Sequence, residues 1–77
     1  MTKSKVQLKI INRLPVLRAE HKITQEQLAK EVGVTRATIV AIEKSGYNPS
    51  LELAFRISRF FKTDINAIFS IEEEESE

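Results

Sequence analysis

The sequence predicts an all-α fold, a compact bundle of five short helices around one core. A small pair of terminal β-strands is compatible with the sequence but is not required by it. Apolar residues recur three and four positions apart along most of the 77-residue chain, as they do in amphipathic helices. Helix-capping residues precede these runs, and the two glycines and two prolines are too few for a loop-rich or all-β fold. A chain of this length forms one domain with a small, local core.

The first eleven residues predict an arm that precedes the helices. Lys5–Ile10, KVQLKI, alternates polar and apolar residues, which is typical of a short strand; a frayed extension of the next helix fits the same pattern. Asn12 is the expected N-cap of the first helix. Pro15 then falls in the first turn, where proline is tolerated, so this helix should run from about Arg13 to about Lys22.

Two helices should meet at a tight turn in the middle of the chain. Thr24 and Gln27 predict a capping box at the start of the second helix, and Gly33 ends it with the left-handed backbone of a sharp turn. The inner face of this helix is expected to be formed by Leu28, Ala29 and Val32. Thr35 caps the third helix, expected over 35–45, only two residues later. So short a gap excludes ordinary antiparallel packing, and the two helices must cross steeply.

Two further helices and an acidic end complete the chain. Ser50 caps a fourth helix, expected to reach Phe61, and Thr63 caps a short fifth helix. The apolar segment FSI, residues 69–71, fits a brief strand. The core face of the fourth helix should consist of Leu53, Ala54, Ile57 and Phe61. The expected organisation is an arm (1–11), a helical domain (12–71) and an acidic disordered tail (72–77).

Charge is sorted along the chain, although the formal net charge is only +1. Residues 1–62 hold all 12 lysines and arginines and five acids, a net of +7, whereas residues 64–77 hold six acids and no cation. A basic body suits a polyanionic partner. The acidic end is most simply a solvated tail; a mimic that suppresses weak DNA binding is the functional alternative.

Catalytic and metal-binding chemistry find no support in the residues. His21 is the only histidine, no serine or carboxylate is placed for a triad with it, and its position in the last helical turn suits a surface residue. The chain has no cysteine, so disulfides and thiolate metal sites are excluded. No apolar run approaches the roughly 18 residues of a membrane helix, and no signal peptide opens the chain. We expect a cytoplasmic protein without cofactor, metal or membrane partner.

The third helix has an unusual outward face. Ile39 and Ile42 share the side that must be core, and the opposite side places small residues between two cations. This outward face consists of Arg36, Ala37, Val40, Ala41 and Lys44. With Gln25, the turn at Gly33 and the two inward isoleucines, this order of residues is typical of a helix–turn–helix, in which the second helix of the pair enters the DNA major groove. The alternative is an ordinary α-hairpin bundle in place of a helix–turn–helix.

The segment TQEQLAKEVGVTRATIVAIEKSGYNPSLELAFRISRFF resembles the lambda-repressor/Cro-like helix–turn–helix family, also called the xenobiotic-response-element type. The likeness extends from about Arg13 to Phe69 and includes LPVLRAE, AIEKSGYNPSLELA and INAIF. It implies a bundle of five short helices and a regulator that binds double-stranded DNA, mostly as a dimer. It also implies that Arg18 and Glu43 form a structural ion pair between the first and third helices.

Candidate DNA contacts follow from the outward face and from the resemblance. Arg36 can donate to guanine, and alanine or valine can touch thymine methyl groups. The expected base-reading residues are Arg36, Ala37, Val40 and Ala41. Relatives often carry polar residues where Ala37 and Ala41 stand, so we expect modest specificity; helix propensity alone also explains these alanines. The expected phosphate contacts are Gln25, Thr35, Thr38, Lys44, Tyr47 and Asn48. A Tyr47 ring packed on the domain is the alternative for that residue.

An apolar patch predicts a homodimer, which would place two reading helices about 34 Å apart, one turn of DNA. Its expected members are Leu51, Phe55, Ile65, Ile68 and Ile71, and the two terminal strands could extend the contact. Phe55 could instead fold over the end of the core. The expected function is sequence-specific DNA binding by a transcriptional regulator, a repressor. The alternatives are the antitoxin of a toxin–antitoxin pair, with a toxin partner, and a protein-interaction module for a coregulator on the same fold.

Overall fold

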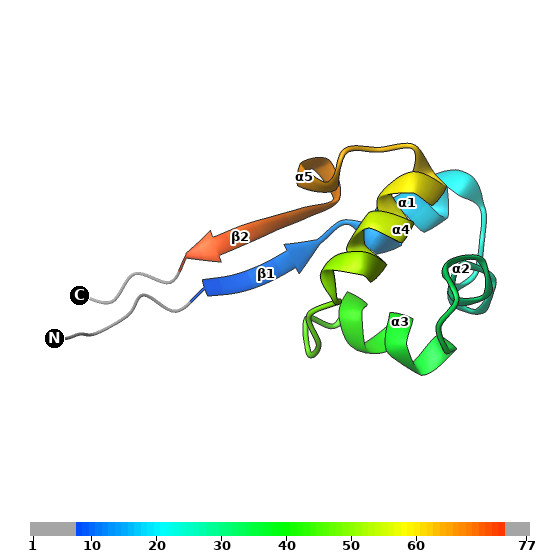
Figure 1. Ribbon diagram of the computed structural model, residues 1–77, viewed down its shortest axis with the longest axis horizontal. Helices are drawn as coiled ribbons and strands as arrows, with labels where there is room; N and C mark the ends of the chain where they lie inside the picture. Colours follow the sequence, from blue (N-terminus) through cyan, green and yellow to red (C-terminus); the bar gives the residue numbers. More distant parts are fainter. Residues whose placement is uncertain (1–7, 74–77) are drawn as a thin grey trace, which may run out of the picture.

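The computed structural model describes residues 8–73, in which five helices form a compact body and two strands form a ribbon that extends from it (Figure 1). In chain order the elements are β1 (Leu8–Asn12), α1 (Leu14–His21), α2 (Gln25–Val32), α3 (Arg36–Glu43), α4 (Leu51–Phe61), α5 (Ile65–Ile68) and β2 (Phe69–Glu73). The prediction of a helical bundle with a small strand pair is therefore confirmed. No helix of the described part of the chain is long and apolar enough to span a membrane.

One apolar core receives side chains from all five helices. The side chains that are almost completely buried are Leu14, Leu28, Ile39, Ile42, Ile57 and Ile68. Burying one such side chain stabilises the fold by about 1.5–3 kcal/mol. The predicted inner faces of α2, α3 and α4 are all confirmed. Ile68 is 1% exposed, so its prediction as a dimer-interface residue is wrong: the single turn of α5 directs it into the core.

The two terminal strands pair in antiparallel register. Ile10 lies opposite Ile71 and Asn12 opposite Phe69, so apolar side chains share one face of the ribbon. At its base, the Arg13 N–H donates to the Ile68 carbonyl at 2.9 Å and closes the ribbon onto the body. The pairing of the two terminal strands, which the sequence left undecided, is therefore present in the structure.

The strand boundaries correct two predictions. The first strand begins at Leu8 and continues through Asn12, so it lies further along the chain than the predicted Lys5–Ile10. Residues 5–7 lie outside the described residues. The second strand includes Glu72 and Glu73, because both have partners in β1, and these two residues therefore do not belong to a disordered tail. Residues 74–77 lie outside the described part of the chain.

The caps around α2 and α3 are those that the sequence predicts. The Thr24 hydroxyl accepts from the Gln27 N–H at 3.0 Å, and the Gln27 side chain accepts from the Thr24 N–H at 2.8 Å, which completes the capping box. Gly33 follows α2 with a φ of 79°, a conformation that a side chain would strain. Thr35 accepts from the backbone of Thr38 at 3.3 Å and starts α3. These caps fix both ends of the turn between the two helices.

Helix α3 is shorter than predicted. Helix α3 runs from Arg36 to Glu43, because its C-terminal cap falls on Lys44.

The start of α1 also differs from the prediction. Arg13 is the N-cap of α1 and makes no side-chain cap bond, so the assignment of Asn12 as the cap is wrong. The Asn12 amide oxygen instead accepts from the Leu14 N–H at 3.0 Å, while its amide nitrogen donates to the Ile42 carbonyl at 2.9 Å. Asn12 thus ties α1 to the end of α3.

The cap of α5 is Asp64 and not Thr63. Lys62 caps the C-terminal end of α4 with a left-handed backbone, and the Thr63 N–H donates to the Ser58 carbonyl at 3.1 Å. In this turn the Thr63 hydroxyl donates to the Phe61 carbonyl at 3.0 Å, back toward the end of α4. The Asp64 carboxylate accepts from the Asn66 N–H at 2.8 Å instead. The two ends of adjacent helices therefore share one turn.

Candidate nucleic-acid interface

The turn between α2 and α3 brings the two helices close together at a steep angle. After Gly33, the Val34 N–H donates to the Ala29 carbonyl at 2.9 Å, which closes the turn. Ala29 is 2% exposed, and its small side chain lets α3 approach α2. Ile39 and Ile42 hold the inner face of α3 in the core. The opposite face of α3 is therefore presented outward along one side of the molecule (Figure 1).

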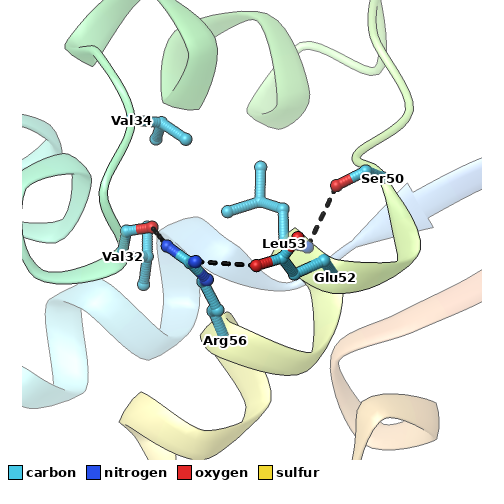
Figure 2. Close-up of a pocket in the computed structure, with 6 residues that line it drawn as sticks. All are labelled: Val32, Val34, Ser50, Glu52, Leu53 and Arg56. Atoms are coloured by element: carbon cyan, nitrogen blue, oxygen red, sulfur yellow. Dashed lines mark hydrogen bonds and ion pairs between the residues drawn. The ribbon is translucent and has the colours of Figure 1, made fainter.

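Helix α4 supports this turn from behind. Figure 2 shows Val32, Val34 and Leu53 around a groove between the turn and the start of α4. Arg56 donates to the Val32 carbonyl at 3.4 Å, where α2 ends, and its other nitrogen binds Glu52 at 2.7 Å. A cation at this position also compensates the partial negative charge at the end of α2. Sequence reasoning missed this contact, because the residues are 24 positions apart.

The outward face of α3 carries small side chains in its middle and a cationic side chain at each end. Arg36 and Ala37 are exposed on its first turn, Val40 and Ala41 are half-buried, and Lys44 is exposed at its C-terminal cap. The structure thus places the four expected base-reading residues together on one face of a helix. Small side chains there allow a helix backbone to come near the base edges of DNA.

The other candidate phosphate contacts flank α3 at both ends. Thr35 is exposed and Thr38 is half-buried, and their hydroxyls lie 3.1 Å apart. Tyr47 and Asn48 lie in the loop between α3 and α4 and are exposed, Tyr47 by 48%. About half of the surface of Tyr47 is therefore accessible. Both ends of α3 present groups that can donate hydrogen bonds to phosphate oxygens.

Arg18 and Glu43 form the ion pair that the resemblance implies. Arg18 Nε donates to Glu43 Oε2 at 2.7 Å and Nη2 donates to Oε1 at 3.1 Å, while Nη1 donates to the Ile23 carbonyl at 3.2 Å. The two side chains are only 19% and 8% exposed. The hydrogen bond with Glu43 raises the pKa of Arg18 above its ordinary value, more than burial lowers it. Arg18 therefore stays charged, and its ion pair with Glu43 ties α1 to α3.

Gln25, the first residue of α2, is joined to this pair. Its amide Nε2 donates to Glu43 Oε1 at 3.0 Å, so the carboxylate accepts from two different helices. The sequence did not indicate this bond, since the two residues are 18 positions apart and neither has a local partner pattern. Beside Gln25 there is an open hollow, which also adjoins the first residue of α3. It is lined by Arg18, Ile23, Thr24, Gln25, Glu26 and Arg36.

The residues of the predicted dimer patch do not share one environment. Leu51 and Phe55 on α4 are 72% and 54% exposed, and Ile71 on β2 is 58% exposed. Ile65 is half-buried, and Ile68 belongs to the core. Leu8, which sequence reasoning did not select, is 54% exposed on the ribbon face that also carries Ile71. The exposed apolar surface thus involves α4 and the ribbon.

This fold and this site define a helix–turn–helix domain of the DNA-binding class: α2 and α3 cross at a glycine turn, and α3 presents a small, basic outward face. A family model described as helix-turn-helix matches residues 17–68. The chain belongs to the lambda-repressor/Cro-like helix–turn–helix family, which is a family of DNA-binding transcriptional regulators and not of enzymes.

Individual relatives agree with this assignment. An uncharacterized HTH-type transcriptional regulator of Methanocaldococcus jannaschii is 55% identical over 64 residues, which cover 83% of this chain and 97% of that protein. The immunity repressor of Bacillus phage phi105 is 33% identical over a match that covers 84% of this chain and 48% of the repressor. The crystal structure of a Bacteroides fragilis protein matches with a TM-score of 0.71 over 79% of this chain and 98% of that chain. Its 24% identity makes this a similarity of fold.

Proposed function

We propose that this protein is a sequence-specific repressor that binds double-stranded DNA as a homodimer, with α3 in the major groove. The observation that carries the proposal is the outward face of α3. Arg36 and Ala37 are exposed on its first turn, and the next turn presents only valine and alanine outward. A solvent-facing helix ordinarily carries polar residues on this side, whereas a helix in the groove needs a slim one.

Each position on this face has a definite role in the proposal. Arg36 donates to the O6 and N7 acceptors of a guanine, because the N-terminal end of the reading helix points at the base edges. Ala37, Val40 and Ala41 touch thymine methyl groups and form no hydrogen bond with a base. Specificity is therefore modest, and the shape of the DNA contributes part of it.

Contacts to the DNA backbone position the reading helix. Gln25 at the start of α2 and Thr35 and Thr38 at the start of α3 contact phosphates on one side. Lys44, Tyr47 and Asn48 contact the backbone beyond the other end of α3. Because these contacts neutralise phosphates without reading bases, they contribute affinity that falls as salt rises.

A second copy of the chain covers the exposed apolar residues in the proposed dimer. Leu51 and Phe55 of α4 and Ile71 of β2 are each more than half exposed, which supports them as contacts. Ile65 is half-buried and contributes less to the proposed contact, whereas Leu8 is exposed on the same face of the ribbon as Ile71 and joins it. Such a dimer presents two α3 helices to successive half-sites about one helical turn apart.

The assignment as a repressor is supported by two relatives. The immunity repressor of Bacillus phage phi105 and the transcriptional repressor RstR of a cryptic Vibrio cholerae phage are each 33% identical to this chain. The present chain spans about half of each of them, 48% and 49%. The matched part of the two repressors includes the helix–turn–helix. We therefore propose that this chain, like them, binds DNA and represses transcription, with α3 making the DNA contact and the bound protein blocking the promoter.

Selection of the protein on a random duplex pool at about 150 mM salt, followed by sequencing, tests the proposal. We expect enrichment of an inverted repeat whose half-sites lie about one helical turn apart, about 34 Å. Enrichment of a single half-site would remove the homodimer from the proposal. A folded protein that enriches no sequence would overturn the proposed function and favour a protein partner, either a toxin or a coregulator.

A further inference from the structure

The carboxylate of Glu43 lies at the centre of a small network beneath the start of α2. Its Oε2 accepts from Arg18 Nε, and its Oε1 accepts both from Arg18 Nη2 at 3.1 Å and from Gln25 Nε2 at 3.0 Å. Glu43 is on α3, Arg18 is on α1 and Gln25 begins α2. The bound guanidinium compensates the negative charge of Glu43, so the carboxylate can hold the Gln25 amide without placing a free charge there.

This contact determines which way the Gln25 side chain is turned. A carboxamide can be rotated to exchange its oxygen and its nitrogen, but only the nitrogen can donate to a carboxylate. Glu43 therefore fixes the nitrogen on its own side. The same nitrogen carries a second N–H, for which the structure gives no acceptor within residues 8–73. Gln25 also lines the open hollow at the start of α2, where this donor can meet a ligand.

Other donors converge on the same hollow. Arg36, the first residue of α3, lines it with an exposed cationic side chain. The backbone N–H groups of Gln25 and Glu26, in the first turn of α2, have no acceptor within residues 8–73. Those of Thr24 and Gln27 are already satisfied by the capping box. Free N–H groups and the positive end of a helix favour an anion.

We propose that Glu43 is a positioning residue for DNA binding, which orients the Gln25 amide toward one backbone phosphate held in this hollow together with Arg36. The inference rests on the proposed function and refines it. The guanidinium of Arg36 carries five N–H donors, so it can donate to this phosphate in addition to the guanine contact of the proposed function. Glu43 itself does not touch DNA; it acts through Gln25.

The negative charge of Glu26 disfavours a phosphate in the hollow and therefore offers a separate test of the proposed phosphate site. Its exposed carboxylate also lines the hollow and would repel the phosphate. The substitution Glu26→Gln removes that charge and keeps the shape, so we expect it to strengthen binding about twofold or more. A glutamine that left affinity unchanged or weakened it would contradict a phosphate at this place.

A double-mutant cycle tests the role of Glu43. Dissociation constants for the DNA site obtained by selection are measured for wild type, Gln25→Ala, Glu43→Gln and the double variant. We expect Gln25→Ala to lose about tenfold, since a hydrogen bond to a charged group is removed. Glu43→Gln should lose about threefold in the wild-type background and almost nothing when Gln25 is absent. Equal losses in both backgrounds would overturn the inference.

Loss of stability must be separated from loss of positioning. Thermal unfolding shows whether each variant is folded at the assay temperature, and Glu43→Asp replaces Glu43→Gln if the latter is not, since a shorter carboxylate cannot hold both partners. Phe61→Leu is the matched control: it perturbs the core at the far end of α4, and we expect its affinity to stay within twofold of wild type. An equal loss of affinity in Phe61→Leu and Glu43→Gln would assign the effect to stability.

A second measurement does not depend on DNA. In the free protein, the two side-chain N–H signals of Gln25 should be shifted away from those of an unbonded glutamine in nuclear magnetic resonance spectra. Gln25→Ala assigns these signals, and Glu43→Gln should return them to ordinary values. Unshifted signals in wild type would overturn the inference. If wild type binds no duplex, the proposed function fails, whereas normal binding with an additive cycle removes only the role of Glu43.

Discussion

The guanidinium of Arg18 and the carboxylate of Glu43 join α1 to α3 through two hydrogen bonds, 2.7 and 3.1 Å long. Both side chains are mostly buried, 19% and 8% exposed. A buried pair of this kind contributes less than its Coulomb energy suggests, because both ions have lost water. Breaking it is costly for the same reason, since the remaining ion is left without a partner.

We expect Glu43→Ala to lower the free energy of unfolding by about 3 kcal/mol, the cost of a stranded, largely buried arginine. Urea denaturation followed by circular dichroism measures this change. Glu52→Ala is the control, because the Glu52–Arg56 pair is 73% and 53% exposed and should contribute at most about 0.5 kcal/mol. Equal decreases in the free energy of unfolding for the two substitutions would show that burial does not make the loss of Glu43 more costly than the loss of an exposed partner.

Arg36→Ala should weaken binding to the preferred site by about 1–3 kcal/mol and relax the base preference there. The reason is the loss of a bidentate donor at the N-terminal end of the reading helix. Titration of matched and mismatched duplexes measures both effects. Arg59→Ala serves as a control, because it removes the same charge from an exposed position on α4. If Arg36→Ala weakens all duplexes equally, then Arg36 contacts only the backbone.

Gly33→Ala should destabilise the fold by about 1–2 kcal/mol, since the backbone φ is 79° and a side chain there is strained. A Cβ at this position would also lie 2.9 Å from Arg56 Nη1, although the arginine can move. Thermal unfolding of Gly33→Ala, Gly33→Asn and Gly33→Ala with Arg56→Ala separates the two effects. Asparagine should be the mildest change. Full recovery in the double variant would mean that the clash, and not the backbone, sets the cost.

Removal of residues 74–77 should leave the fold intact and strengthen weak, salt-sensitive DNA binding. The deletion takes away Glu74, Glu75 and Glu77 and so raises the net charge from +1 to +4, while the paired strand β2 is retained. Binding to a random duplex is measured over a range of salt. Replacing the three glutamates by glutamine gives a control of equal length. A loss of stability on deletion would show that these residues support the ribbon.

Phe55→Glu should weaken homodimerisation, because it places a charge on an apolar residue of α4 that is 54% exposed. Sedimentation equilibrium measures the change in the dissociation constant of the dimer, and circular dichroism checks the fold. Val16→Glu is the control on α1, where the side chain is 43% exposed and lies outside the proposed interface. A dimer that tolerates Phe55→Glu would exclude α4 from the contact.

The sequence by itself determined the features that depend on neighbours in the chain. Thr24, Gln27 and Gly33 define the ends of α2 through bonds that span three or four residues, and helical spacing marked Ile39 and Ile42 as core. The helix–turn–helix and its outward face follow from these local features, because capping and periodicity are written within single helices.

Only the tertiary structure decided the contacts between distant segments. Nothing near Ile68 in the sequence indicates that a single helical turn directs it into the core, because isoleucines spaced three residues apart give the same pattern on a surface. The register of the ribbon depends on where α5 returns the chain, so the strands could not be bounded from either end alone. The partners of Gln25 and Asn12 lie 18 and 30 residues away, and only the packing of α3 against α1 and α2 brings them within hydrogen-bond distance.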